Sequence, residues 1–385
     1  MQEKVLSKKA LIFTDQQAYW SCWGAIWLEE TALENISGAR FLRNPLSKDW
    51  SKISFTSVEN GYYSLYDELV ESYLRRQLSF ESDILNAFSG ITQVLSSIRN
   101  DSFHWGLPES RFDRYLGWKM YGGSKRNNAM CPVYMRGQPT ECVRFPSWSW
   151  TAWFGGGQSF IGWEGSTERL QGEPEIIFYK RDIKGVLSMI TDRTERIKQA
   201  PTQEERWLEE KISDIRTQWK GHPRTISKAL ATGFNDFIDT SYLYFWTSTA
   251  ELYIHRTGLD SPFGPYYSII WDHQINERPT EIYIESSSHL QFRDPKIMEN
   301  LPKHVLKRIE ADNTSDILVK EFAVIGRSMR HGDPIKAHLL SNLTTLVIEW
   351  EGQPGQVAHR IGVSSVRELD WVHLQNREWK RVVLR

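Results

Sequence analysis

The hydrophobic period of this chain changes near residue 130, and that change limits the possible folds more than any other feature of the sequence. Before it, apolar residues recur every three or four positions, which is the spacing of one face of an α-helix. The clearest such series is Ile84, Phe88, Ile91, Leu95 and Ile98. After it, short apolar runs are separated by turn residues, a pattern typical of β-strands. Helices followed by a β-rich part predict an α+β fold.

Two helices are expected in succession before the change of period. The first covers Tyr62–Leu78, where apolar residues line one side and charged residues the other. The second begins after a short connection at Ser79–Glu81, and the hydroxyl of Ser82 is suited to accept a backbone N–H at its start. Because the connection is so short, the two helices should form an antiparallel hairpin.

The part after residue 130 holds a series of strand candidates. They are Phe145–Phe154, Glu175–Tyr179, Val186–Thr191, Ser241–His255, Tyr266–Trp271, Glu281–Ser286, Ile317–Ile325, Thr344–Glu349 and Trp379–Leu384. In the first of them, Trp148 and Trp150 should lie on one strand face. Thr202–Lys220 interrupts the series with a charged sequence that carries an apolar stripe, which predicts a helix inserted in the β-rich part. At the other end of the chain, Ala10–Thr14 and Ala18–Trp27 also read as strands, the first of them buried.

The charge balance argues against a nucleic-acid partner. Lys and Arg number 47 and Asp and Glu 48, for a formal net charge of -1, whereas nucleic-acid-binding proteins usually carry a basic excess. No run approaches 18 apolar residues, so we expect no membrane span. The first residues carry charge without a following apolar segment, unlike a signal peptide. These features together predict a cytoplasmic globular protein.

Residue patterns for a complete catalytic or metal site are missing from the sequence. Cys22, Cys131 and Cys142 are too few and too scattered for a disulfide framework or a zinc site. Neither a phosphate-binding loop nor a nucleophile elbow occurs, and we therefore expect no metal and no cofactor. Glu349 and Glu351 have the strand spacing of a carboxylate pair for acid–base chemistry, but an exposed strand end is the better interpretation.

Aromatic residues are abundant, with 17 Trp, 15 Tyr and 17 Phe. They supply large buried areas in protein cores, but tryptophan rings can also stack on sugar rings. Trp148, Trp150 or Trp153 would be the stacking residues of a glycan-binding module. Alternation in a strand next to Pro146 fits core packing equally well, and both interpretations stay open at this point.

Four parts of the chain occur in the same order in one known family. They are Gln2–Ser7 with Ala10–Phe13 and Tyr19–Cys22, then Tyr66–Leu78 with Ser82–Ile91, then Pro146, Ser147, Trp148, Ser149 and Trp150, and last Ala358–Val363 with Trp371 and Glu378–Trp379. In this order they resemble blocks of fungal heterokaryon-incompatibility (HET) domain proteins. The resemblance covers roughly residues 1–160 and 340–385. The Pro-Ser-Trp-Ser-Trp block is the family hallmark, and we expect its residues to be structural.

The resemblance also implies a division of the chain. Residues 1–55 would be the C-terminal remnant of a HET-like domain and 56–120 a helical hairpin region. Residues 121–385 would form a mostly antiparallel β-rich body with a helical insertion near 202–220, on which the α/β remnant and the hairpin pack. The HET blocks that lie upstream in the family do not occur here. We expect residues 1–30 to be marginally stable, because the first strand would then lack its usual neighbours.

Proteins of this family act in self/non-self recognition and trigger cell death when incompatible fungal cells fuse. The resemblance implies that this chain is the C-terminal body of such a protein, a binding, sensing or scaffold part with protein partners and no activity of its own. The HET domain is similar to TIR domains, some of which cleave NAD with a glutamate. Glu3 falls on that position, so the alternative is an NAD-cleaving cell-death effector that needs the missing upstream domain.

Overall fold

The structure is a computed structural model of the chain and divides it into two compact units, Met1–Asp101 and Ser102–Arg385. It describes residues 9–13, 18–22, 26–28, 58–76, 78–121, 125–135, 138–154, 157–159, 176–190, 240–261, 264–271, 281–284, 301–303, 305–307, 317–329, 341–352 and 357–385. Each unit is considered by itself. The domain boundaries expected near residues 55 and 120 stay predictions.

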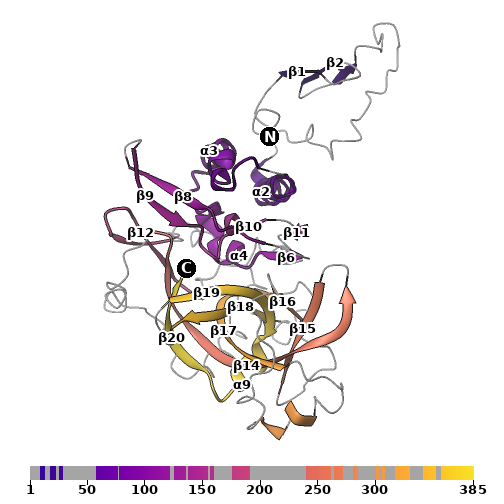
Figure 1. The fold of residues 1–385 in the computed structure, drawn as a ribbon, viewed down its shortest axis with the longest axis vertical. Coiled ribbons are helices and arrows are strands. Elements are labelled where there is room, and N and C mark those ends of the chain that lie inside the picture. The colour runs from indigo at the N-terminus through magenta and orange to yellow at the C-terminus, as the bar shows by residue number, and fades with distance from the viewer. Residues whose placement is uncertain are drawn as a thin grey trace, which may run out of the picture. The chain divides into compact units, whose positions relative to one another are not determined.

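The first unit contains a small antiparallel sheet. Its strands are β1 (Lys9–Phe13), β2 (Ala18–Cys22) and β3 (Ile26–Leu28), in the order β1-β2-β3 (Figure 1). The prediction that the first strand is buried is wrong, because Leu11 is 55% and Phe13 75% exposed. Alternation along a strand places both side chains on one face, and that face is the exposed one.

Two helices follow in the same unit, as the apolar spacing predicts. They are α2 (Val58–Leu74) and α3 (Asn86–Arg99). The apolar stripe on the second helix is confirmed, since Phe88, Ile91 and Leu95 are buried. A hydrogen bond of 2.8 Å from the Tyr73 hydroxyl to the carbonyl of Ile84 joins the end of α2 to the segment before α3.

The start of the second helix differs from the prediction. Ser82 lies inside a 3-10 turn, η3 (Glu81–Asp83), and does not cap α3. The backbone N–H of Asp83 donates to the carbonyl of Phe80 at 3.1 Å, an i to i+3 bond that closes this tighter turn. The α-helix therefore begins several residues later, at Asn86.

A nine-stranded sheet dominates the second unit (Figure 1). Its strands are β12 (Phe178–Arg181), β13 (Leu187–Met189), β14 (Leu243–Ser261), β15 (Gly264–Ile270), β16 (Glu281–Ile284), β17 (Ile317–Met329), β18 (Ser341–Glu351), β19 (Val357–Arg367) and β20 (Glu378–Leu384). Every pairing is antiparallel except that of β19 with β20. The α+β class with a mostly antiparallel sheet is confirmed.

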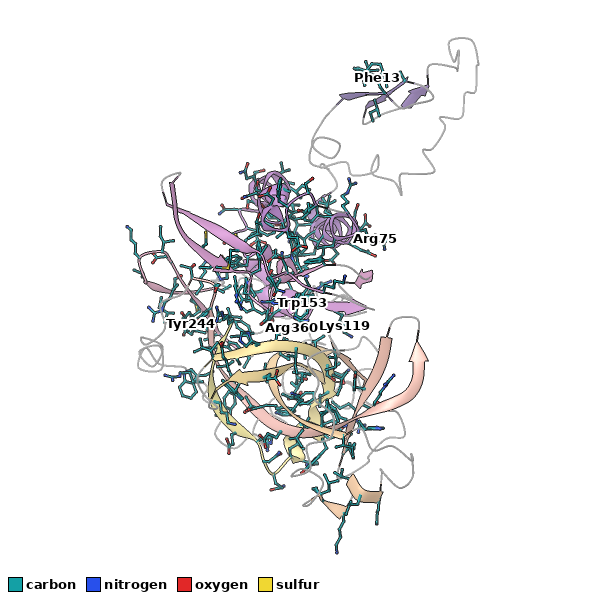
Figure 2. All side chains as sticks on the ribbon, viewed as in Figure 1. Phe13, Arg75, Lys119, Trp153, Tyr244 and Arg360 are labelled. Atoms are coloured by element: carbon teal, nitrogen blue, oxygen red, sulfur yellow. The ribbon has the colours of Figure 1, made fainter. Side chains whose placement is uncertain are left out.

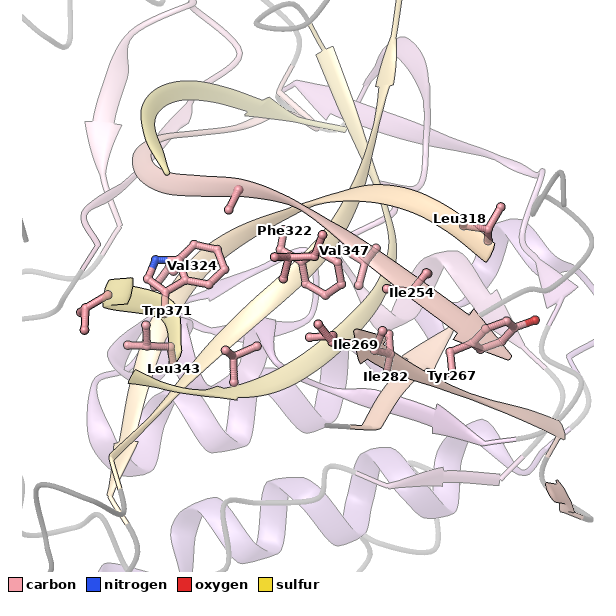
Figure 3. Packing of buried hydrophobic residues seen from close by; sticks show 14 residues of the cluster. Ile254, Tyr267, Ile269, Ile282, Leu318, Phe322, Val324, Leu343, Val347 and Trp371 are labelled. Carbon is pink, nitrogen blue, oxygen red and sulfur yellow. The ribbon is translucent and has the colours of Figure 1, made fainter. Parts of the chain in front are cut away.

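Six of these strands close into a barrel. The order runs β14-β15-β16-β19-β18-β17, and β17 pairs again with β14. Apolar side chains fill the interior (Figure 3). They come from all six strands and are Ala250, Leu252, Ile254, Tyr267, Ile269, Ile282, Leu318, Phe322, Val324, Leu343, Val347 and Val366. The short helix α9 (Glu368–His373) adds Trp371, whose Nε1 donates to the Ser248 hydroxyl at 3.1 Å. The interior is thus a packed core.

Short elements occupy the first part of the second unit. They are β4 (Phe103–His104), β5 (Leu107–Pro108), η4 (Glu109–Arg111), α4 (Phe112–Leu116), β6 (Lys119–Tyr121), β7 (Lys125–Arg126), β8 (Met130–Met135), β9 (Gln138–Arg144), η5 (Trp150–Ala152), β10 (Trp153–Phe154) and β11 (Gly157–Ser159). Their strands pair two by two, outside the large sheet. Of these elements, the β4–β5 hairpin and α4 contact the Pro-Ser-Trp-Ser-Trp segment.

The expected strand Phe145–Phe154 is wrong over most of its length. Residues 146–149 form a turn closed by a bond of 3.0 Å from the Ser149 N–H to the carbonyl of Pro146, and η5 follows. Pro146 cannot donate to a sheet, and the Ser149 hydroxyl accepts the N–H of Thr151 at 3.1 Å, which favours a helical turn.

The other predictions concern the remaining strands, the inserted helix and a membrane span. The other strand candidates after residue 130 all overlap strands of the large sheet, and the two near the start of the chain overlap β1, β2 and β3. Strands β8, β9 and β19 were not expected. The inserted helix at Thr202–Lys220 lies outside the described residues. Within the described residues, no helix is long and apolar enough to cross a membrane.

Candidate functional site

The Pro-Ser-Trp-Ser-Trp segment is a buried junction of the second unit. All five residues are buried, and Trp148, Ser149 and Trp150 have no exposed surface. Segments that are far apart in the sequence meet around them, namely the β4–β5 hairpin, α4, the start of β14, β19 and the end of β20. Figure 2 labels Trp153 and Arg360, which lie in this region.

Ser147 connects the junction to the C-terminal strands. Its hydroxyl accepts the backbone N–H of Arg360 in β19 at 2.9 Å and donates to the backbone carbonyl of Arg385. The two partners lie 213 and 238 residues further along the chain. One small hydroxyl therefore satisfies a buried backbone donor and also bonds a partly buried backbone acceptor.

Arg360 is the main charged group of the junction. Its side chain is 1% exposed, and its guanidinium donates to the backbone carbonyls of Leu116, at 2.5 Å, and of Trp118. The guanidinium carbon lies 3.8 Å from the centroid of the Trp118 ring, a cation–π contact. The Trp118 indole N–H in turn donates to the carbonyl of Trp148 at 2.7 Å. Carbonyl dipoles and an aromatic face thus solvate this buried cation.

A strained turn lies on the other side of the junction. Trp105 and Gly106 join β4 to β5 with φ values of +49° and +85°, and two positive φ angles are typical of the type I′ hairpin turn. The Ser149 hydroxyl donates to the carbonyl of Trp105 at 2.6 Å. A Cβ at Gly106 would lie only 2.7 Å from Cζ2 of Trp150. Glycine is therefore the residue that both the backbone and the Trp150 ring require.

The tryptophans of the junction make their contacts within the protein itself. The indole N–H of Trp148 donates to the carbonyl of Ser241 at 3.2 Å, and that of Trp153 to the carbonyl of Ser147 at 3.0 Å. Trp148 and Trp150 are fully buried and Trp153 is 3% exposed. No face of these three rings is open to a sugar, so a stacking role for them has no structural support.

His104 is the titratable group closest to the centre of the junction. Its ring stacks on Trp148 with 5.4 Å between centroids and 22° between planes, and its buried Nε2 has no hydrogen-bond partner. Burial, together with the positive charge of Lys180, lowers the pKa of His104 to about 3. Lys180 itself pairs with the buried carboxylate of Glu109. The imidazole is neutral near pH 7, and a base this weak is poorly suited to general acid–base catalysis.

The carboxylates considered for acid–base chemistry lie at the surface. The side chains of Glu349 and Glu351 are 46% and 57% exposed. Glu349 pairs with Lys320 at 2.6 Å, and Glu351 with His359 at 3.0 Å. The hydrogen bond from His359 holds the pKa of Glu351 below its usual value, with Arg385 adding to the effect. Both residues are therefore exposed near the end of β18, as the sequence predicts, and the ion pairs were not expected.

The remaining candidate, Glu3, lies outside the described residues. Among the residues that the structure describes, no cluster of His, Cys, Asp and Glu could hold a metal ion. Sequence reasoning missed Gly106, Trp118 and Arg360 as members of the junction. For Arg360 a signal existed, since it belongs to the closing block of the HET resemblance. The chain matches no protein-family model, no characterised protein and no solved structure.

Proposed function

We propose that this chain is the C-terminal body of a fungal heterokaryon-incompatibility protein. In this role it acts in the cytoplasm as a binding, sensing or scaffold part of self/non-self recognition, with no enzymatic activity of its own. Its partners are proteins. The glutamate-dependent cleavage of NAD would belong to a complete HET domain and not to this chain.

One contact supports the proposal more than any other. The bond of 2.9 Å from the Arg360 N–H to the Ser147 hydroxyl joins the Pro-Ser-Trp-Ser-Trp block to the closing block. These are two of the four blocks on which the resemblance rests, and more than two hundred residues separate them. Blocks that recur together in the same order are expected to contribute to the same part of the structure. Here the Pro-Ser-Trp-Ser-Trp block and the closing block form a single buried junction. The junction holds the barrel strands to the preceding short elements, as a scaffold requires.

Inducible expression of the chain in a filamentous fungus tests the proposal. A binding part without activity competes with complete HET proteins for shared partners. We therefore expect fewer dead fusion cells, by about threefold or more, when incompatible strains meet. Vital staining of fused cells gives the count. An unchanged count at high protein level would contradict the proposed role.

Two controls make this result specific. The Gly106→Val variant places a branched side chain against Trp150 at a positive φ, so it should fail to fold and should not protect the fused cells. Purified chain incubated with NAD should leave the NAD concentration unchanged. Turnover of NAD by the purified chain would refute the statement that it has no activity of its own.

A further inference from the structure

One face of the large sheet carries a cluster of aromatic and aliphatic side chains, here called the Tyr244 patch. Its centre is Tyr244 and Val383, which are buried. The residues packed around them are only partly buried, and they are Tyr179, Leu187, Tyr242, Trp246 and Val357. The patch spans β13, β12, β14, β20 and β19, and Figure 2 labels Tyr244 within it. Tyr179, Tyr242 and Trp246 are thus aromatic residues that the patch leaves partly exposed.

Strand register explains why this face carries aromatic residues. Tyr179 lies opposite Tyr244 on one side and Met189 on the other, so the three side chains form one row across the sheet. The neighbouring Phe178 and Phe245 point to the opposite face, where Phe178 packs on Phe112. Phe112 of α4 therefore covers Phe178 on that opposite face. The Tyr244 patch is the face that remains partly exposed.

The β12–β13 hairpin extends the patch into solvent. Ile183 and Val186 in its turn are 45% and 57% exposed, and Met189 in β13 is 45% exposed. The turn is held in shape by the Asp182 carboxylate, which accepts the N–H of Lys184 at 2.9 Å and of Val186 at 2.8 Å. These exposed apolar side chains are therefore displayed on a pre-organised backbone, which lowers the entropic cost of binding.

Basic side chains accompany the patch. The guanidinium carbons of Arg181 and Arg385 lie 5.4 Å and 5.9 Å from the ring centroids of Tyr244 and Tyr242. Arg381 lies opposite Trp246, and Lys184 is exposed in the turn. Among the described residues the acidic groups beside them are fewer, namely Asp182, which is bonded to the turn backbone, and Glu351, which pairs with His359 and Arg385. The described residues of the patch therefore carry a positive local charge, although the whole chain is nearly neutral.

We propose that the Tyr244 patch and the β12–β13 hairpin together bind an acidic, extended segment of another protein. Tyr, Trp, Met and Arg are the residues enriched in protein interfaces, and positive charge selects a partner that carries Asp and Glu. Among the described strands β13 pairs with β12 alone, so an extended segment can add to its other edge. This inference specifies the surface for the binding role proposed above and rests on that role.

Selection of peptides against the purified full-length chain tests the inference without any cell-death readout. The probe is a phage-displayed library of random peptides of about twelve residues. We expect the selected peptides to be enriched in Asp and Glu, and to bind less tightly when salt is raised from about 50 to about 500 mM. A lack of enrichment, or selected peptides without an acidic excess, would overturn the inference. So would binding to anionic lipid vesicles in place of peptides.

Matched variants locate the binding site. Met189→Glu should weaken peptide binding by about tenfold or more, because it adds a negative charge to the apolar row. Met130→Glu is the control, since Met130 is 44% exposed and lies in β8, outside the patch. Lys184→Glu and Lys125→Glu form a second pair, with loss of binding expected only for the first. Equal effects within either pair would show that the peptides bind elsewhere and would refute the assignment. Failure here leaves the proposed function standing, because the expression test counts protected fusion cells whichever surface of the chain binds the partner.

Discussion

Replacing Gly106 with alanine is the sharpest test of the junction, because the added methyl group is disfavoured both by the backbone conformation and by the Trp150 ring. The backbone at Gly106 has a φ of +85°, which residues with a Cβ rarely adopt. The methyl group itself would lie 2.7 Å from Cζ2 and 3.0 Å from Cε2 of Trp150. Trp150 is fully buried, so its ring cannot swing away into solvent.

The expected loss of stability follows from these two terms. A left-handed backbone costs a residue with a Cβ about 1–2 kcal/mol, and overpacking a full core costs about 1–3 kcal/mol. Alanine lowers the entropy of the unfolded chain and returns about 0.4–1 kcal/mol. We therefore expect Gly106→Ala to lower the free energy of unfolding by about 2–4 kcal/mol. For the unit Ser102–Arg385, that corresponds to a fall in Tm of roughly 3–7 °C.

Thermal unfolding followed by tryptophan fluorescence is the appropriate assay, because the junction contains several buried tryptophans. Gly326→Ala in β17 is the matched control. Gly326 is also buried, but a Cβ there would lie 3.6 Å from Cβ of Asp113, an ordinary van der Waals distance. We expect the control to shift Tm by less than about 2 °C. If Gly106→Ala were as stable as Gly326→Ala, the packing of Gly106 against Trp150 would be wrong.

Three further predictions concern buried polar groups, each measured by urea unfolding. Ser147→Ala removes the bonds to Arg360 and Arg385 and should cost about 2–3 kcal/mol, whereas Ser97→Ala on the exposed face of α3 should cost less than about 0.5 kcal/mol. His104 has a pKa of about 3 in the folded chain and about 6.5 when unfolded, so the unfolded state binds more protons between these pH values. The free energy of unfolding should therefore fall as pH drops below about 6.5, by up to about 1.4 kcal/mol per pH unit, and His104→Phe should remove this dependence. Burial raises the pKa of Glu321, but hydrogen bonds from Lys380 and Trp350 outweigh this effect and hold the pKa below its ordinary value. The contribution of Glu321 to stability is thus present at neutral pH and lost as pH falls through the lowered pKa. If Glu321→Gln unfolded with the same acid dependence as the natural chain, the role of the hydrogen bonds to Glu321 would be contradicted.

Local sequence patterns predict most of the individual elements. The stripe from Ile84 to Leu95 is buried as expected, because helical period and burial depend on residues close together in the sequence. The strands after residue 175 are found for the same reason. The start of α3 is missed, because a serine before an apolar run fits a 3-10 turn as well as an N-cap.

The closed barrel could not be predicted from the sequence. β19 reads Val-Ala-His-Arg-Ile-Gly-Val-Ser-Ser-Val-Arg, with two basic residues and a glycine inside it, and such a sequence resembles a loop. It becomes a strand because β18 and β16 lie on its two sides. Closure of β17 onto β14 depends on pairing between residues about seventy positions apart, which no local pattern contains.

The junction was predicted in part. Pro146, Ser147, Trp148, Ser149 and Trp150 stand out by composition and by their resemblance to the HET hallmark. Their conformation was assigned wrongly, because alternating Trp and Ser has strand period whatever the backbone does. The roles of Gly106 and Arg360 depend on contacts across the fold.

The bond between Ser147 and Arg385 also has a consequence for how the chain is made. The two residues are 238 positions apart, and ribosomes add roughly 5–20 residues per second. Ser147 is therefore synthesised about 12 to 48 s before Arg385, which directly follows β20. Throughout that interval the Ser147 hydroxyl lacks the acceptor to which it donates in the folded chain. A nascent chain of this kind completes its long-range contacts later than one built from local contacts, and its folding is correspondingly slower.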